Sequence, residues 1–147
     1  MSDVKKDKND RPIDTEMATA EFDRFCEAWE LDNDESTLDN ESKIDFTRLK
    51  KQFITAVERG RLSFNDDETL SYTFSDKSAS KAGQVLKMGR PKGAAYMEMD
   101  KYKEQQGIHK FYSVMAAMSG HDPKYFSDID GIDLKPLQAI VSLFLAG

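Results

Sequence analysis

The residue types best suited to catalysis or metal binding are sparse in this chain. His109 and His121 lie twelve residues apart, and neither has a cysteine or glutamate at the spacing of a metal ligand. A zinc site needs three or four converging ligands, and no Cys–His or Ser–His–Asp arrangement has supporting local context. We expect both histidines to be surface residues. The sequence predicts no catalytic residue, no metal site and no cofactor, so the chain is not expected to be an enzyme.

Two acidic segments invite comparison with calcium-binding loops, and both depart from the pattern. An EF-hand loop places ligands at positions one, three and five, glycine at six and glutamate at twelve. The segment DNDESTLDNESK has Asp32, Asp34 and Ser36 at the first three positions, but it lacks the glycine and has Lys43 at the twelfth. The segment DIDGIDL (residues 128–134) has its glycine at the fourth position. A helix-capping role for Asp133 explains the second segment.

The segment GRPKG (residues 89–93) resembles sites that bind DNA or phosphate. Gly-Arg-Pro is the centre of a minor-groove hook that reads Arg-Gly-Arg-Pro, but here the first arginine is missing and Met88 precedes the glycine. The segment also lacks the spacing of a phosphate-binding GxxxxGK[ST] loop. A turn explains these residues better: Pro91 ends a strand, Gly93 relaxes the turn, and a helix begins.

Methionine and aromatic residues are concentrated between residues 88 and 118. Five of the seven methionines lie there, with several aromatic residues among them: Met88, Met97, Met99, Met115, Met118, Tyr96, Tyr102, Phe111 and Tyr112. Such a stripe is usually part of a core, but methionine also forms adaptable surfaces that bind varied partners. Met97 favours the second interpretation, because it falls off the stripe made by Ala95, Met99 and Tyr102. This side chain is expected to face solvent.

The composition indicates one globular domain in a reducing compartment. A chain of 147 residues with 39% hydrophobic residues is long enough for one core. Its single cysteine, Cys26, excludes an internal disulfide. There is no run of 18 apolar residues and no apolar segment near the start, so we expect neither a membrane span nor a secretory signal.

The net charge of −6 conceals an asymmetry along the chain. Residues 1–45 carry fifteen Asp and Glu against six Lys and Arg, a balance of −9, whereas residues 46–147 carry twelve against fifteen, a balance of +3. The acidic region is either a solvated surface or a segment that folds back over a basic face or mimics an acidic partner. The overall acidity argues against a dedicated nucleic-acid binder, because neutralised phosphates supply most of that affinity.

The elements that must position these residues begin with helices. Residues 1–18 are predicted to be a disordered, charged tail. Residues 19–31 carry Phe22, Phe25, Cys26 and Trp29 at helical spacing, with Thr19 as the expected N-cap. Residues 42–60 form a second predicted helix, whose face is lined by Phe46, Leu49, Phe53 and Val57 and which ends at Gly60.

The pattern then changes to strands and returns to helices. Residues 61–75 alternate apolar and polar side chains around NDDE, which predicts a hairpin. Residues 84–91 form a third strand, at the edge of the sheet because it contains Pro91. Helices are predicted over residues 93–106, 107–120, 122–129 and 133–147. The fold class is therefore α+β: N-terminal helices (19–60), a small antiparallel sheet (61–90) and a C-terminal helical bundle (91–147) in one domain, 19–147.

The C-terminal half resembles the small tail assembly chaperones of Mu-, P2- and lambda-like bacteriophages over about residues 83–147. Four pieces carry the resemblance: LKMGRPKG (Leu86 to Gly93), MSGHDP (Met118 to Pro123), FSDIDGIDL (Phe126 to Leu134) and LQAIVSLFL (Leu137 to Leu145). The family's order of elements is a strand, a turn, a helix, a helix that ends at a glycine turn, a short helix after Asp-Pro and a final apolar helix, and these pieces match parts of that order. Most of these motifs are turns and caps. Residues 1–60 have no counterpart in the short members of the family.

The resemblance implies a protein that binds other proteins and catalyses nothing. Such chaperones bind the tape measure protein, and often tail tube subunits, in the bacterial host cytoplasm, and they are absent from the mature virion. Many are made in two lengths by a programmed ribosomal frameshift, and self-association is compatible with the family. No membrane or nucleic-acid partner is implied. The alternative is a small regulatory or nucleic-acid-associated phage protein that uses the basic segment 87–103.

The expected client-binding surface combines Met97 with the methionine and aromatic residues near it in the sequence. A groove lined by methionine and aromatic side chains would accept an amphipathic helix of the client. The candidate groove residues are Tyr96, Met97, Met99, Tyr102, Phe111, Tyr112, Met115 and Met118, and the candidate basic rim consists of Lys87, Arg90, Lys92, Lys101 and Lys103.

Overall fold

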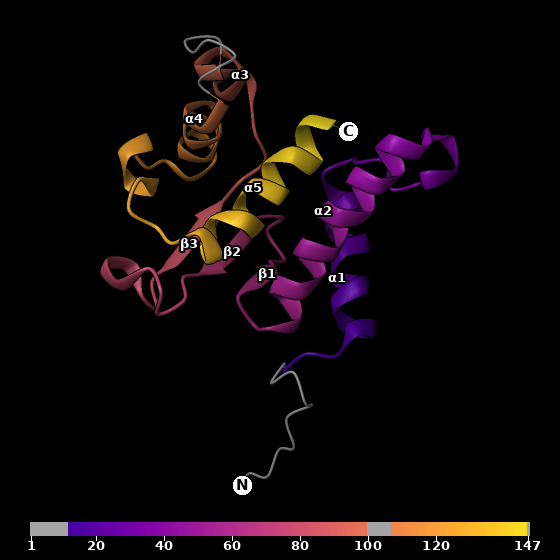
Figure 1. Cartoon of the computed structure of the whole chain (residues 1–147), viewed down its shortest axis with the longest axis horizontal. Coiled ribbons are helices and arrows are strands. Elements are labelled where there is room, and N and C mark those ends of the chain that lie inside the picture. The colour runs from indigo at the N-terminus through magenta and orange to yellow at the C-terminus, as the bar shows by residue number, and fades with distance from the viewer. Residues whose placement is uncertain (1–11, 100–106, 147) are drawn as a thin grey trace, which may run out of the picture.

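The structure is a computed structural model that describes residues 12–99 and 107–146, apart from the side chains of residues 98, 99, 107, 108 and 146. The fold is α+β, with N-terminal helices, a three-stranded antiparallel sheet and C-terminal helices (Figure 1). The elements are α1 (Thr15–Ala28), η1 (Glu35–Thr37), α2 (Asn40–Glu58), β1 (Leu62–Phe64), β2 (Leu70–Thr73), η2 (Ala79–Lys81), β3 (Val85–Met88), α3 (Gly93–Met99), α4 (Gly107–Ser119), η4 (Pro123–Phe126) and α5 (Gly131–Ala146).

Helix α1 begins earlier than the sequence pattern indicated. Its N-cap is Asp14, whose side chain accepts a hydrogen bond from the backbone N–H of Met17, so the helix starts at Thr15 and not after Thr19. Ala18 is buried, which places this first turn against the core. Residues 15–18, which were predicted to belong to the tail, are therefore helical, because Asp14 caps the helix before Thr19.

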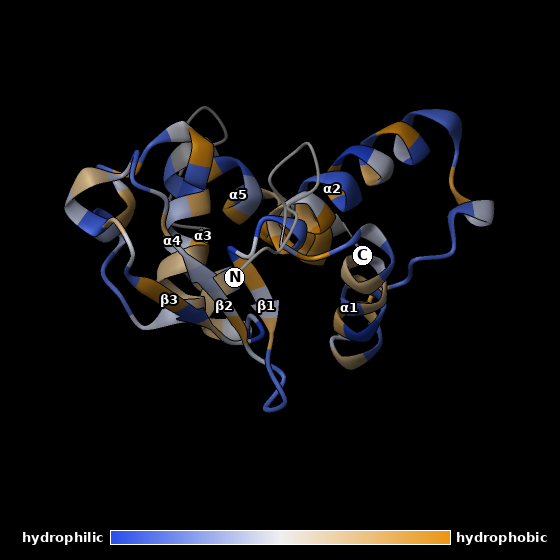
Figure 2. Ribbon diagram, turned by 90° about the horizontal axis from the view of Figure 1, so that it is seen from below, coloured by the Kyte–Doolittle hydropathy of each residue, from blue (hydrophilic) through white to orange (hydrophobic). Residues whose placement is uncertain are grey.

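The N-terminal helices enclose an aromatic cluster. The ring of Phe25 stacks on Phe53 of α2 with centroids 4.7 Å apart, and it also contacts Phe22, Trp29 and Phe64 of β1. These rings join α1, α2 and the first strand into one core. Hydrophilic residues dominate the connection between α1 and α2 (Figure 2). Helix α2 ends at Glu58 with Arg59 as its C-cap, and the residue that follows, Gly60, has a positive φ of 77°.

The predicted hairpin and third strand are confirmed. Strands β1 and β2 pair with Leu62 opposite Tyr72 and Phe64 opposite Leu70, and β3 adds on the other side of β2 with Leu86 opposite Tyr72. All these apolar side chains are buried on one face of the sheet. Helix α4 contacts β3 at one edge, and α1 and α2 contact β1 at the other.

The C-terminal helices pack against the rest of the fold through α4, which contacts β3, and through α5, which lies alongside α2 (Figure 1). The predicted Asp-Pro helix start is confirmed, since the Asp122 side chain accepts from the N–H of Lys124 at the start of η4. The prediction that Asp133 caps the last helix is wrong. Helix α5 begins at Gly131, and Asp130 supplies the capping oxygen to the N–H of Ile132.

Within the described residues, every helix is too short or too polar to cross a lipid bilayer.

Candidate functional site

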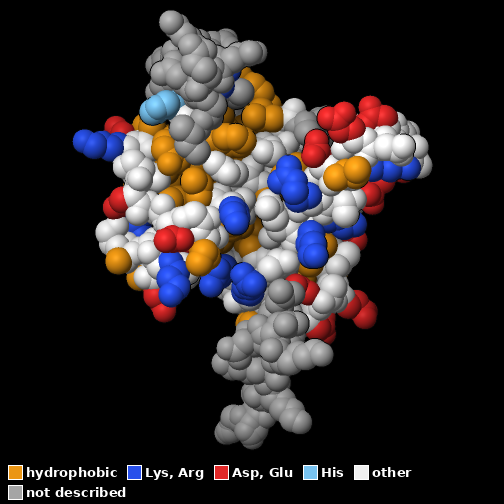
Figure 3. Space-filling view, viewed as in Figure 1, with side chains coloured by type: hydrophobic (Ala, Val, Ile, Leu, Met, Phe, Trp, Pro, Cys, Tyr) orange, Lys and Arg blue, Asp and Glu red, His pale blue; other side chains and the backbone are white. Residues whose placement is uncertain are grey.

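Helix α3 presents two large hydrophobic side chains to solvent. Met97 is 70% exposed and Tyr96 is 43% exposed, whereas Ala95 on the other side of the helix is buried. The Tyr96 ring lies 6.4 Å from the ring of Phe144 near the end of α5, and the next residue, Leu145, is exposed. Hydrophobic side chains gather around this part of the surface (Figure 3). We call Tyr96, Met97, Phe144 and Leu145 the α3 patch.

The other groove residues lie at different depths. Met115 and Met118 of α4 are buried in the core, and so is Met88. Phe111 and Tyr112 are half-buried, and Tyr112 stacks on Phe126. Of Met99 only the backbone is described, and Tyr102 lies outside the described residues. The methionine-rich segment therefore divides into a packed part on α4 and an exposed part on α3.

The β1–β2 hairpin forms ion pairs with two residues of the candidate basic rim. Lys87 Nζ lies 2.8 Å from a carboxylate oxygen of Asp67, and an Arg90 guanidinium nitrogen lies 3.3 Å from Glu68 Oε1. The hydrogen bond from Lys87, followed by that from Thr69, lowers the pKa of Asp67 to about 2. Lys92 is exposed, and Lys101 and Lys103 lie outside the described residues. Two of the five rim cations are thus paired within the fold.

The described part of the chain holds no group of three or more His, Cys, Asp and Glu side chains that could bind a metal ion. His121 is exposed and stacks on Tyr125 with centroids 4.0 Å apart, and His109 is also exposed. Cys26 is buried in the core, and this burial raises the pKa of its thiol to about 12. A thiol that stays protonated at neutral pH is a poor nucleophile.

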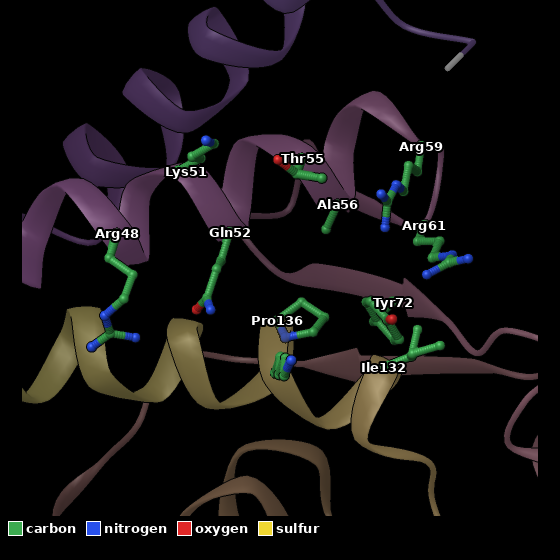
Figure 4. A pocket seen from close by; sticks show the side chains of 11 residues that line it. Arg48, Lys51, Gln52, Thr55, Ala56, Arg59, Arg61, Tyr72, Ile132 and Pro136 are labelled. Atoms are coloured by element: carbon green, nitrogen blue, oxygen red, sulfur yellow. The ribbon is translucent and has the colours of Figure 1, made fainter. Parts of the chain in front are cut away.

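A basic cleft that the sequence analysis did not predict lies between α2 and α5 (Figure 4). Its volume is about 430 Å³, and its floor includes Tyr72 of β2. The lining residues are Arg48, Lys51, Gln52, Thr55, Ala56, Arg59, Arg61, Tyr72, Ile132, Lys135 and Pro136. Five of them are cations and none is a carboxylate. The surface view shows the same concentration of Lys and Arg over this region (Figure 3).

Part of this cleft can be recognised in the sequence. Arg48, Gln52, Thr55 and Arg59 recur at helical spacing along α2, so they share one face of that helix. The remaining cations could not be assigned to the same site, because Arg61 precedes β1 and Lys135 lies in the distant helix α5. Only the packing of α5 on α2 brings them together.

Below this cleft, Asp133 forms a buried polar network. Its carboxylate is fully buried and accepts hydrogen bonds from the Tyr72 hydroxyl at 2.7 Å and the Ser78 hydroxyl at 2.6 Å. The backbone N–H and the hydroxyl of Ser75 also donate to it. The Ser78 hydroxyl oxygen in turn accepts from the N–H of Asp130. The network joins the start of α5 to β2 and to the loop that follows it.

The pKa of Asp133 predicts a pH dependence of stability. Burial opposes ionisation, but the hydrogen bonds from Ser78, Tyr72 and Ser75 outweigh it and hold the pKa below its ordinary value. A depressed folded-state pKa stabilises the fold above the unfolded value of about 3.9, and this contribution is lost as the pH falls through the folded-state value. We expect urea midpoints to fall as the pH is lowered from about 5 towards 2, and Asp133→Asn to reduce that slope.

The exposed Asp67→Asn variant is the matched control, because Asp67 also has a lowered pKa but lies at the hairpin tip. Its effect on the slope should be smaller, since solvent screens an exposed pair. An Asp133→Asn variant with the full wild-type slope would contradict the assignment.

Comparison of the chain with protein-family models, curated proteins and solved structures finds no match.

Proposed function

We propose that this protein is a non-catalytic tail assembly chaperone of a bacteriophage or prophage. In this proposal it binds the tape measure protein, tail tube subunits or both in the host cytoplasm and is left out of the mature virion. The single observation that carries the proposal is the α3 patch, where Tyr96 and Met97 are exposed beside the end of α5. An exposed group of large apolar side chains is typical of a protein-binding surface.

The order of elements in the C-terminal half supports the same proposal. The resemblance implies a strand, a turn, a helix, a helix that ends at glycine, a short helix and a final apolar helix. Strand β3 is followed by α3, by α4, whose last residue precedes Gly120, by η4 and by α5. This agreement concerns the arrangement of elements, and the client is inferred from the resemblance alone.

The physical basis of the proposed activity is mass action. A tape measure protein is long, and until the tail tube encloses it its apolar helical faces are exposed to aggregation. A protein that binds these faces lowers the concentration of the aggregating species. An amphipathic client helix would place its apolar side against Tyr96 and Met97. The nucleic-acid alternative has less support, since two cations of segment 87–103 are paired with the hairpin.

The double variant Tyr96→Asp with Met97→Asp is expected to lose client capture. Two carboxylates at the centre of an apolar contact would have to be buried on binding, so the client should bind at least about tenfold more weakly. The measurement is co-expression with the tape measure protein from the same genome, followed by pull-down and by quantification of soluble client.

The matched control is Met17→Asp with Ile44→Asp, which adds the same charge at exposed apolar positions on α1 and α2. Met17 is 63% exposed and Ile44 is 69% exposed. This control should retain capture and solubility. Capture that survives in a folded Tyr96→Asp, Met97→Asp protein would exclude the α3 patch as the binding site. A client that stays insoluble with the wild-type chain would reject the chaperone function itself.

A further inference from the structure

We propose that the basic cleft between α2 and α5 binds an acidic, amphipathic segment of a partner protein. This site is separate from the α3 patch, and the proposal goes beyond the chaperone function because it does not depend on which client is bound. Three features of the molecule support this site: the mostly unpaired cations that line the cleft, the apolar side chains beside them, and the lack of a suitable acidic ligand within the chain itself.

Four of the five cations of the cleft form no ion pair with any other described residue. Among the described residues, no carboxylate lies within ion-pair distance of Lys51, Arg59 or Lys135, and Arg48 reaches Asp45 only at 3.9 Å. Elsewhere the chain pairs such cations: Lys81, for example, binds Asp128 at 2.6 Å. Five neighbouring cations in a protein of net charge −6 form a local positive potential that attracts an anionic ligand.

The shape of the cleft favours a peptide over a small ion. Arg48 and Arg59 are eleven residues apart on α2, so they are separated by about 16 Å along the helix axis. Ala56 and Pro136 lie between Arg48 and the end of the cleft at Arg61, and Ile132 lies beside Tyr72 at that end (Figure 4). A segment with alternating acidic and apolar side chains would use both parts of this surface, whereas an isolated anion would use only one or two cations.

The chain itself does not supply the ligand. The sequence of residues 1–11 contains three Asp against four Lys and Arg, so this segment is not acidic. The acidic loop between α1 and α2 is also unsuited to bind a second copy. Asp34 and Asp39 already cap their own helices, and two copies of net charge −6 repel one another.

Nucleic acid fits the cleft less well than a peptide. A phosphate backbone makes no use of an apolar floor, and its affinity rises with the number of phosphates neutralised. The five cations end where α2 reaches Asp45 and Glu41. A long polyanion that continued past this end would meet these like charges, whereas a short acidic segment would stop before them.

The test measures the fluorescence anisotropy of a labelled peptide with the full-length protein. The probe is a fluorescein-labelled peptide of about 14 residues made of Glu, Leu and Ala, long enough to span the cleft as a helix. We expect binding at low salt that weakens as salt is raised. Lys51→Glu with Arg59→Glu should reduce the affinity about tenfold or more. A peptide with Gln in place of Glu should bind far more weakly than the acidic probe.

Two controls separate the cleft from general charge and from the α3 patch. Lys77→Glu with Lys124→Glu changes the net charge equally at exposed positions outside the cleft and should change affinity less than about twofold. Tyr96→Asp with Met97→Asp should bind the probe as the wild type does, so failure of the chaperone proposal leaves this one standing. If the first cleft variant does not fold, Arg48→Gln with Lys135→Gln replaces it.

Three results would overturn the proposal. One is the absence of probe binding at low salt, and another is an equal loss of affinity in the cleft variant and the Lys77, Lys124 control. The third is tighter binding of a single-stranded thymidine oligonucleotide of similar length than of the peptide, together with weaker binding of that oligonucleotide to the cleft variant than to the wild type. That result would assign the cleft to nucleic acid.

Discussion

Replacement of Asp133 by alanine is expected to lower the free energy of unfolding by about 3–5 kcal/mol. The carboxylate is fully buried and accepts from the Tyr72 hydroxyl, from the N–H and hydroxyl of Ser75 and from the Ser78 hydroxyl. Alanine would leave these donors buried without their acceptor, and each such donor costs about 1–3 kcal/mol. Partial entry of water should keep the total below the sum of the separate penalties.

Urea denaturation followed by circular dichroism measures this effect as a shift of the midpoint. Asp133→Asn should cost less than Asp133→Ala, because the amide oxygen still accepts hydrogen bonds from part of the network. Asp128→Ala is the control, since Asp128 is an exposed aspartate that pairs with Lys81, and its midpoint should stay close to that of the wild type. A loss below about 1 kcal/mol in Asp133→Ala would mean that the network does not stabilise the fold.

The second large effect is expected from Phe25→Ala, at about 3–5 kcal/mol. The Phe25 ring is fully buried and contacts Phe22, Trp29, Phe53 and Phe64, so its removal opens a cavity where α1, α2 and β1 meet. The loss combines the transfer free energy of the ring with the cost of a cavity that the surrounding rings only partly fill. Met17→Ala is the control on the same helix, because Met17 is exposed and should change stability by no more than about 0.5 kcal/mol.

Calorimetry of the Phe25→Ala variant also tests the domain organisation. If residues 19–147 form one domain, the melting temperature should fall while unfolding remains a single transition. Two separate transitions, of which only the first moves, would show that the N-terminal helices unfold independently of the sheet and the C-terminal helices.

The fold class was predictable because local periodicity determined most of the elements. The alternation of Leu62 and Phe64, and of Leu70 and Tyr72, predicted the hairpin, and its register in the structure buries these four side chains on one face. Gly60 likewise marked the end of α2. Both errors in helix starts occurred where two residues near the start of a helix could serve as the N-cap. Asp130 and Asp133 both lie near the start of the last apolar helix, and only contacts with residues far away in sequence, such as Tyr72, distinguish the cap from the buried acceptor.

The sites were less predictable because they depend on packing between distant elements. The exposure of Met97 followed from its position off the apolar stripe and is found in the structure. Met115 and Met118 belong to the same compositional cluster, but α4 turns them into the core. The basic cleft could not be predicted from one segment, because its cations come from α2, from the start of the hairpin and from α5.

Trp29 gives the molecule an intrinsic optical probe. It is the only tryptophan in the chain, and its indole N–H donates to the backbone oxygen of Glu68 at 2.9 Å. The indole ring contacts Phe144 with centroids 6.0 Å apart, and Phe144 in turn contacts Tyr96. Emission excited at the red edge of the indole band therefore originates from one ring, separated by a single phenyl group from the exposed surface of α3. Binding of a tryptophan-free ligand to that surface can therefore be followed by the fluorescence of Trp29, without any label.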